Sequence, residues 1–205
     1  MDTARYVLAL LAVLMYPPAV GWWYVTHPFI GFWRRLGRPV FYGVVTVGSF
    51  AMMAIIYLFR EPLLAVEYGT DPYLWPLAFL FYGASVYVEL RCRKRLDLKI
   101  LLGAPELERS GKGGRLITGG IYARMRHPRY VAVWLGTVAW ALFTNYLAVY
   151  VIAVALVPAL YLVAVLEERE LRQRFGAEYV EYCRRVPRRF VPTLRSTGSS
   201  RPLSR

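Results

Sequence analysis

LITGGIYARMRHPRYVAVWLGTVAWALFTNYLAVYVIAVALVPALYLVAVL is the sequence from residue 116 to residue 166, a basic segment followed by two apolar runs. The first run, 130–143, would extend only about 21 Å as a helix, which is less than the thickness of a bilayer core. The second run, 146–166, is long enough to span and contains Pro158. Thr144 and Asn145 separate the runs and favour a tight turn. The stretch therefore predicts a helical hairpin that returns to the side of the membrane where it began.

Three further apolar runs precede this hairpin, at 4–25, 40–59 and 73–90. Pro17 and Pro18 interrupt the first run, so we expect a kink or a break there. The whole chain is 57% hydrophobic, which is too apolar for an ordinary soluble domain. The sequence predicts an all-α, multi-span helical membrane protein with about five transmembrane helices.

The net charge of +13 lies entirely in the second half of the chain. Residues 1–90 hold five Lys/Arg and five Asp/Glu, whereas residues 91–205 hold 21 and eight. A basic half suits either nucleic acid or the cytoplasmic face of a membrane protein, and the apolar runs favour the membrane, so no nucleic-acid partner is expected. Counting positive charges puts the loop 34–38 and the segment 91–129 in the cytoplasm, and the acidic loop 61–71 and the N-terminus outside. We expect a multi-pass protein of a prokaryotic inner membrane.

The C-terminal part has its own pattern. Residues 167–185 predict an amphipathic cytoplasmic helix, with Leu171, Phe175, Tyr179 and Tyr182 on one face, that ends at Pro187. The chain divides into three membrane helices (1–94), a cofactor-binding part with connector, hairpin and C-terminal helix (95–192), and a disordered tail (193–205). In the connector, 98–102 is expected to begin a short interfacial helix and 111–114 to form a turn.

His127 is one of two histidines in the chain. Both the histidine and the arginines around it have two possible interpretations. It could simply precede a helix that begins with Pro128, or it could bind a ligand together with Arg124, Arg126 and Arg129, because a helix N-terminus attracts anions. The arginines could equally be membrane-surface anchors.

The acidic residues Glu167, Glu168 and Glu170 end the last apolar run, and they could either neutralise neighbouring arginines or bind a cofactor. Arg188 and Arg189 could be anchors or a clamp on an anionic substrate. The sequence contains no recognisable nucleophile–base pair, which favours chemistry in which a cofactor supplies the reactive group. It contains no CxxC or Cys/His cluster, so no metal is expected.

Three segments in order carry a resemblance: LITGGIYARMRHPRY (116–130), EERELRQRFGAEYVEY (167–182) and VPRRFVP (186–192). Together with the hairpin they resemble the isoprenylcysteine carboxyl methyltransferase family and are similar to related phospholipid methyltransferases, over about residues 95–192. The resemblance implies an integral membrane methyltransferase that uses S-adenosylmethionine. It implies that the segment 116–130 and the segment after the last span enclose this cofactor at the cytoplasmic face.

The resemblance also implies which residues form the site. Glu168 and the arginine before Phe-x-Pro, taken as Arg188 although either arginine of the doublet fits, are expected to be catalytic. The expected cofactor-binding residues are Leu116, Gly120, Tyr122, Arg126, His127, Pro128, Tyr130, Glu167, Glu168, Tyr179 and Tyr182.

The methyl acceptor stays open between a prenylcysteine, a phospholipid and another lipophilic molecule. One alternative is a sterol or enone reductase that binds NADPH, because YCRRVPRRFVP (182–192) resembles the terminal motif of such enzymes too. The short chain and its few spans weigh against that alternative. Another is a non-enzymatic scaffold that binds anionic lipid through its basic face.

Overall fold

The computed structural model describes residues 2–95, 107 and 114–193, and these ranges are helical apart from loops and one isolated bridge between Glu67 and Tyr146. Four segments are long and apolar enough to cross a membrane: 2–26, 38–58, 72–93 and 147–175. The chain is an all-α, multi-span helical membrane protein, as the sequence predicts. In chain order the elements are α1 (Asp2–Thr26), α2 (Ile30–Leu36), α3 (Arg38–Leu58), α4 (Arg60–Leu63), the 3₁₀ turn η1 (Pro72–Leu74), α5 (Trp75–Arg93), the 3₁₀ turn η2 (Gly120–Ala123), α7 (Pro128–Thr144), α8 (Leu147–Phe175) and α9 (Ala177–Arg185).

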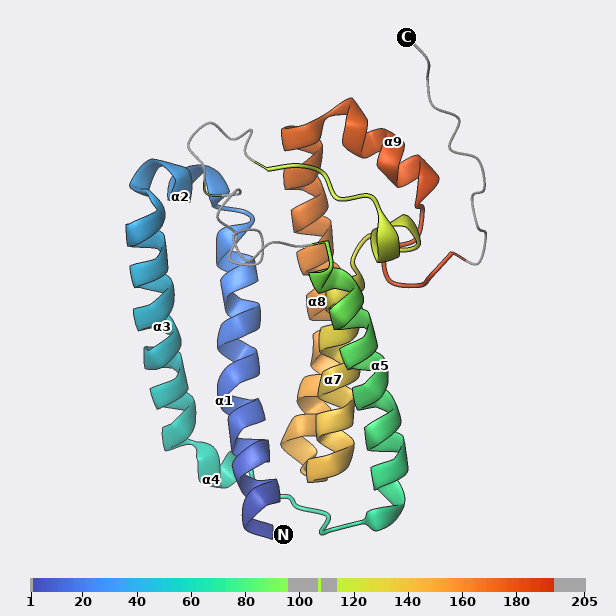
Figure 1. Cartoon of the computed structure of the whole chain (residues 1–205). Coiled ribbons are helices and arrows are strands. Elements are labelled where there is room, and N and C mark those ends of the chain that lie inside the picture. Colours follow the sequence, from blue (N-terminus) through green and yellow to red (C-terminus); the bar gives the residue numbers. More distant parts are fainter. Residues whose placement is uncertain (1, 96–106, 108–113, 194–205) are drawn as a thin grey trace.

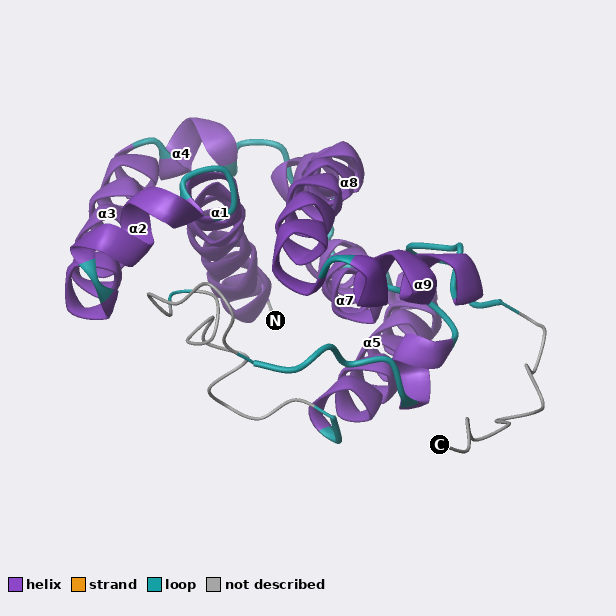
Figure 2. Ribbon diagram, turned by 90° about the horizontal axis from the view of Figure 1, so that it is seen from above, coloured by secondary structure: helices purple, strands orange, loops and turns teal. Residues whose placement is uncertain are grey.

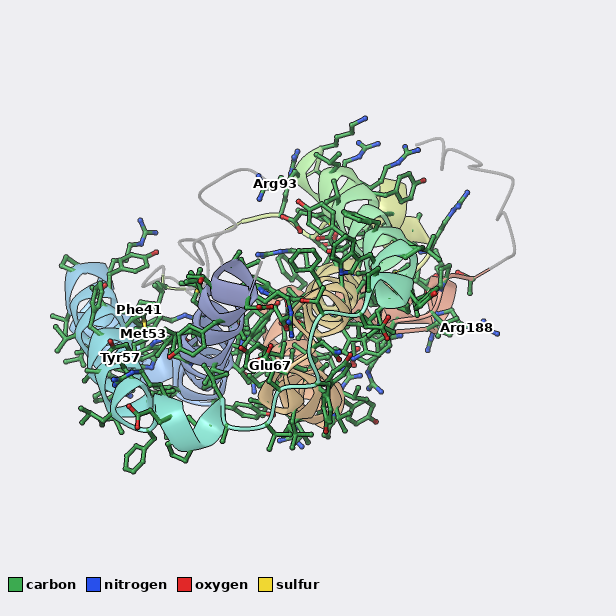
Figure 3. All side chains as sticks on the ribbon, turned by 90° about the horizontal axis from the view of Figure 1, so that it is seen from below. Phe41, Met53, Tyr57, Glu67, Arg93 and Arg188 are labelled. Carbon is green, nitrogen blue, oxygen red and sulfur yellow. The ribbon has the colours of Figure 1, made fainter. Side chains whose placement is uncertain are left out.

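The long helices run side by side, with α2 and α9 at one end and the N-terminus and α4 at the other (Figure 1). Seen from above, α7 and α8 lie between α1 and α5, while α3 lies on the outside next to α1 (Figure 2). The outer residues of α3 are exposed, with Val47 at 71% and Leu58 at 74% of full exposure. Side chains such as Phe41, Met53 and Tyr57 belong to this helix (Figure 3). An exposed apolar helix of this length suits contact with lipid.

Helix α7 is short, but three neighbouring helices pack against it. Its 17 residues extend about 26 Å, less than the roughly 30 Å of a bilayer core. Helices α1, α5 and α8 all pack against it. The Ser85 hydroxyl of α5 donates a hydrogen bond of 2.8 Å to the Ala132 carbonyl, so α5 and α7 approach closely. The hairpin prediction is confirmed, and Asn145 adopts the left-handed conformation (φ 57°) at its turn.

The two prolines of α1 do not end the helix. A break was one of the two expected outcomes at Pro17 and Pro18, but α1 continues to Thr26. In an apolar environment a full break would leave further backbone groups without hydrogen bonds, which costs more than the bonds that the prolines remove.

The expected boundary between the last span and the amphipathic helix is wrong. Helix α8 continues nine residues past Leu166 to Phe175, and the break occurs at Gly176. Ion pairs one turn apart support this extension, at 3.5 Å between Arg172 and Glu168 and at 3.8 Å between Arg174 and Glu170. Gly176 has φ 53° and ψ −125°, a conformation essentially restricted to glycine. The predicted helix 167–185 is therefore the end of α8 followed by α9.

The end of the molecule with the N-terminus is closed by a buried arginine. Arg5 is 1% exposed and contacts the Glu67 carboxylate at 2.9 Å. Its Nε donates to the Thr144 carbonyl at 2.9 Å, and its guanidinium lies over the ring of Tyr146. These contacts fasten α1 to the α7–α8 turn, at the end opposite α9 (Figure 1).

Four further expectations from the sequence concern the loop 34–38, the segment 98–102, the turn 111–114 and the tail. The segment 34–38, expected as a loop, belongs partly to α2, where Trp33 packs against Phe41 and Leu107. The predicted helix 98–102, the turn at 111–113 and the tail from 194 lie outside the described residues.

Candidate active site

Two segments far apart in the sequence lie side by side at the α9 end of the molecule. The Arg126 amide donates to the Arg188 carbonyl at 3.1 Å, and the His127 amide donates to the Arg189 carbonyl at 2.9 Å. The Thr193 amide donates to the Arg124 carbonyl at 3.0 Å. These backbone hydrogen bonds hold the segment after α9 against the loop that leads into α7, so the structure brings the segments 116–130 and 167–192 together.

Glu168 organises the centre of this arrangement. It is 1% exposed and accepts a hydrogen bond of 2.9 Å from the Arg126 Nε. Arg189 binds the same carboxylate through both Nε and Nη2, at 2.9 and 3.0 Å. His127 Nε2 lies 3.2 Å from it. A buried carboxylate that is compensated this fully fixes its neighbours in place and has little capacity left for a ligand.

Both ring nitrogens of His127 face carboxylates. Nδ1 lies 3.2 Å from Glu167 and Nε2 lies 3.2 Å from Glu168. Burial lowers the pKa of His127, but the hydrogen bonds and charges of the two glutamates outweigh it and leave the pKa above its ordinary value. Tyr130 stacks on the imidazole with ring centroids 5.4 Å apart and donates a hydrogen bond of 2.7 Å to Glu167. A histidine with a carboxylate at each ring nitrogen holds the two glutamates in place, and both nitrogens are already engaged, so it is poorly placed to act as a general base.

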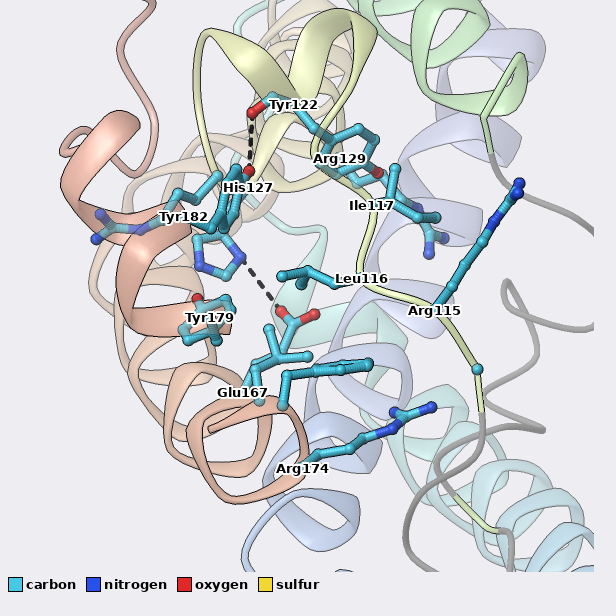
Figure 4. A pocket seen from close by; sticks show the side chains of 14 residues that line it. Arg115, Leu116, Ile117, Tyr122, His127, Arg129, Glu167, Arg174, Tyr179 and Tyr182 are labelled. Atoms are coloured by element: carbon cyan, nitrogen blue, oxygen red, sulfur yellow. Dashed lines mark hydrogen bonds and ion pairs between the residues drawn. The ribbon is translucent and has the colours of Figure 1, made fainter. Parts of the chain in front are cut away.

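A cavity of about 140 Å³ opens beside this network (Figure 4). Helix α8 contributes Glu167 to its wall, and α9 contributes Tyr179 and Tyr182. Burial raises the pKa of both phenols, which therefore remain neutral, and the Tyr182 hydroxyl donates to the Tyr122 carbonyl at 2.8 Å. The lining residues are Gly114, Arg115, Leu116, Ile117, Tyr122, Arg126, His127, Arg129, Glu167, Leu171, Arg174, Phe175, Tyr179 and Tyr182.

Seven of the eleven residues expected to bind a cofactor line this cavity: Leu116, Tyr122, Arg126, His127, Glu167, Tyr179 and Tyr182. The other four support it. Tyr130 and Glu168 hold His127, and Pro128 begins α7. Gly120 has φ 68°, which favours glycine, and a Cβ there would lie only 3.1 Å from the Arg95 Nε.

The structure shows which of the two adjacent arginines, Arg188 and Arg189, lies at the site. Arg188 is exposed and points away from the molecule (Figure 3), whereas Arg189 binds Glu168. Arg188 contributes only its backbone carbonyl, which accepts the hydrogen bond from the Arg126 amide. Arg189, and not Arg188, is thus the arginine that contacts the site.

Half of the cavity lining lies outside the eleven residues that were expected to bind a cofactor. Leu171, Arg174 and Phe175 follow Glu167 at i+4, i+7 and i+8, which is one face of a helix that continues through them. Treating 167–185 as one helix placed Arg174 away from the functional face. Arg115 and Ile117 carried no signal in the sequence beyond their proximity to Leu116.

A second buried carboxylate of α8, Glu170, pairs with a histidine and with arginines. Glu170 is 4% exposed and lies 3.4 Å from His27 Nδ1 and 3.3 Å from the Arg34 Nη2. It joins α2 and the end of α1 to α8 below the cavity. His27 lies in the turn between α1 and α2, and nothing in the sequence indicates its distance to Glu170.

A larger, mainly apolar cavity of about 690 Å³ lies between α1, α5 and α7. Within the described ranges, Arg129 is the residue that lines both this cavity and the polar one. Glu89 and Arg93 lie in the same wall and are paired with each other at 2.8 Å. The remaining lining residues are Leu8, Tyr16, Ala78, Phe79, Tyr82, Ser85, Ala132, Val133, Gly136, Ala139, Trp140 and Phe143.

Comparison with known proteins decides the family. Residues 77–195, from α5 to the end of the segment after α9, match the Ergosterol biosynthesis ERG4/ERG24 family. The chain belongs to this family. It is 32% identical over 89 residues to the Delta(14)-sterol reductase TM7SF2 of Mus musculus, an alignment that covers 39% of this chain and 20% of the mouse protein. Both cavities contain residues from the part of the chain that matches the ERG4/ERG24 family.

This membership corrects the expected resemblance. The assignments to the isoprenylcysteine carboxyl and phospholipid methyltransferases, and to S-adenosylmethionine as cofactor, are wrong. The site gives a physical reason. S-adenosylmethionine carries a sulfonium and an ammonium, yet the carboxylate in the cavity wall, Glu167, is already bound by His127 and Tyr130. Four arginines line the same wall, which suits a ligand rich in negative charge.

The ERG4/ERG24 match supports the alternative hypothesis from the sequence, a sterol or enone reductase. Chain length and number of spans weighed against it. That argument failed because the family match lies in residues 77–195, which include α5, α7, α8 and α9, and does not depend on how many helices precede them.

Proposed function

We propose that this protein is a membrane-bound reductase that uses NADPH to saturate a carbon–carbon double bond in a lipophilic, sterol-like acceptor. The observation that carries the proposal is a pair of cavities, one lined by four arginines and the other large and apolar, that both have Arg129 in their lining. The ERG4/ERG24 membership and the similarity to a Delta(14)-sterol reductase support the same reaction class.

The residue types that line the polar cavity suit the chemical groups of a nicotinamide dinucleotide. Arg115, Arg126 and Arg174 place cationic groups in the wall, as phosphate groups require, and Arg115 has no carboxylate partner in the described part of the chain. Tyr122, Phe175 and Tyr182 offer flat surfaces for rings. At about 140 Å³ the cavity accommodates one part of such a ligand, so we assign it one end of the cofactor.

When bound, NADPH supplies a hydride to the acceptor. The residues of the chain would bind and orient the cofactor and the acceptor. Glu168 holds Arg126, His127 and Arg189 in a fixed arrangement for this role. His127 and Tyr130 in turn fix the carboxylate of Glu167, which faces the cavity. Such preorganisation positions the reacting groups without a nucleophile from the protein.

We further propose that the polar cavity faces the cytoplasm, because the positive residues gather at that end of the molecule. The lipophilic acceptor would enter the apolar cavity from the bilayer, while the soluble cofactor would enter from the cytoplasm. Location in a prokaryotic inner membrane stays a prediction from the sequence.

Thermal unfolding of the purified protein in detergent tests the cofactor. We expect NADP⁺ to raise the unfolding temperature and S-adenosylhomocysteine to leave it unchanged, because a ligand that binds the folded state stabilises it. Arg174→Gln should weaken the NADP⁺ effect, whereas Arg124→Gln, at an exposed position on the same loop system, should preserve it. Stabilisation by adenosylhomocysteine alone would overturn the proposal.

The reaction itself is tested by incubating the protein with NADPH and sterols that carry ring double bonds, with product analysis by mass spectrometry. We expect a product heavier by two hydrogens, formed with stoichiometric loss of NADPH absorbance. No turnover with any sterol, enone or other unsaturated polycyclic lipid would refute the reductase assignment.

A further inference from the structure

Arg129 and Arg115 are the two arginines of the polar cavity that have no carboxylate partner in the described part of the chain, and of these two only Arg129 also lines the apolar cavity. Arg126 and Arg189 are bound by Glu168 at 2.9 Å each. Arg129 is partly buried, and in the described part of the chain it makes no hydrogen bond and no ion pair. A cation in this position retains its full capacity to bind an external oxygen.

The nearby carboxylates are already engaged. Glu89, in the wall of the apolar cavity, binds the Arg93 Nε at 2.8 Å. Glu167, in the wall of the polar cavity, binds His127 and Tyr130. Arg129 lies in the lining of both cavities, so its charge is available to a ligand in either one.

Two kinds of double bond require different help from the protein. An isolated alkene must be protonated before it can accept a hydride, because hydride addition to it would leave a carbanion. An α,β-unsaturated ketone accepts hydride directly at its β-carbon, because the displaced electron pair moves to the carbonyl oxygen. That oxygen then needs a cationic hydrogen-bond donor, and a guanidinium, which does not release its proton, suits this role.

We propose, on the basis of the proposed reductase function, that Arg129 binds the carbonyl oxygen of the acceptor and that the acceptor is an α,β-unsaturated ketone of a polycyclic lipid. A new C–H bond forms at the β-carbon, the C=C pair becomes the C=C of an enolate, and its negative oxygen is held by Arg129. A proton from water then adds to the α-carbon and the carbonyl re-forms. NADPH, when bound, would supply the hydride and water the proton, so the acceptor gains two electrons and two hydrogens.

A binding measurement without cofactor tests the role of Arg129 apart from turnover. A steroidal carboxylate mimics the enolate oxygen, and the steroidal alcohol of the same skeleton is its neutral control. Calorimetric titration should show that Arg129→Gln weakens carboxylate binding by about 10-fold or more, while alcohol binding changes by less than about threefold. Equal effects on both ligands would overturn the proposal, since they would indicate a packing role.

The kinetic test compares a steroidal 4-en-3-one with a sterol that carries an isolated Δ14 double bond. We expect the wild type to prefer the enone and Arg129→Gln to lower kcat on it by about 100-fold, with NADP⁺ affinity nearly unchanged. Arg129→Lys should recover part of the rate, and Arg124→Gln should behave as wild type. Unfolding temperatures of all variants show that each is folded.

The outcomes separate the two proposals. Turnover of the Δ14 sterol but not of the enone would overturn this inference and leave the reductase function standing. Weaker NADP⁺ binding by Arg129→Gln, at unchanged kcat, would overturn it by assigning Arg129 to the cofactor. Turnover of neither class would refute the reductase function itself.

Discussion

At the scale of single residues, Glu168 and His127 determine the geometry of the site. Glu168 is held by two arginines and a histidine from segments that are 21 to 42 positions away in the sequence. His127 joins Glu168 to Glu167. Neither residue therefore needs to touch a ligand for its replacement to abolish ligand binding, because each positions the residues that do.

Glu168→Gln should destabilise the protein strongly. It removes the buried charge that neutralises Arg126 and Arg189, and breaking a buried pair of this kind costs about 3–5 kcal/mol. Unfolding in detergent measures the loss. Glu181→Gln is the matched control, because Glu181 is 57% exposed and its pairs with Arg184 and Arg185 are 3.7 and 4.0 Å long, so a change below about 1 kcal/mol is expected. Similar effects of the two substitutions would contradict the central role of Glu168.

His127 should make stability depend on pH on the alkaline side of neutrality. Its pKa is raised in the folded state, so its contribution is complete below the ordinary histidine pKa of about 6.5 and is lost as the pH rises through the folded value. The unfolding temperature should therefore fall as the pH rises above about 6.5. His127→Gln should flatten this dependence while lowering stability at pH 6. A wild-type profile as flat as that of the variant would refute the assignment of a charged histidine.

At the scale of elements, the boundary between α8 and α9 gives the cavity its shape. The end of α8 presents Glu167, Leu171 and Arg174 on one side, and Gly176 turns the chain so that α9 presents Tyr179 and Tyr182 to the same space. A continuous helix could not enclose the cavity from two directions. The turn depends on a backbone conformation that side chains disfavour.

Gly176→Ala should reduce stability by about 1–3 kcal/mol, since φ 53° with ψ −125° is strained for any residue with a Cβ. An added Cβ would meet nothing within 4 Å, so the effect isolates backbone strain. Gly83→Ala in α5, also in open space but with helical backbone, should be neutral or slightly stabilising. Equal stability of both variants, measured by unfolding in detergent, would argue against the strained turn.

At the scale of the whole molecule, the polar groups divide between two ends of the helical bundle. One end holds the cavity network around Glu168, and the other holds Arg5 with Glu67. Between them the helices are apolar, and α3 exposes its outer face. This division is what a membrane requires of a protein whose charged groups must remain near its surfaces.

The proposed orientation predicts opposite accessibility for the two ends. In a Cys183→Ser background, Arg124→Cys near the cavity should react with a membrane-impermeant maleimide only after cells are permeabilised. Tyr73→Cys, at a position that is 92% exposed at the other end, should react in intact cells. The reverse pattern would place the cavity outside and exclude the proposed entry of cofactor from the cytoplasm.

The sequence alone determined the helical membrane class, the hairpin and half of the residues that line the polar cavity, because hydropathy, helical periodicity and charge placement are local properties of the chain. The tertiary structure decided which arginine binds Glu168, which charges stay unpaired, and that Arg129 borders two cavities, because these depend on distances between segments that are remote in sequence. Local motifs also led to the wrong cofactor. LITGGIYARMRHPRY indicates a basic, tyrosine-bearing helix start, whereas the charge of its ligand depends on the carboxylates that folding leaves available, and Glu167 and Glu168 are already engaged by His127 and the arginines.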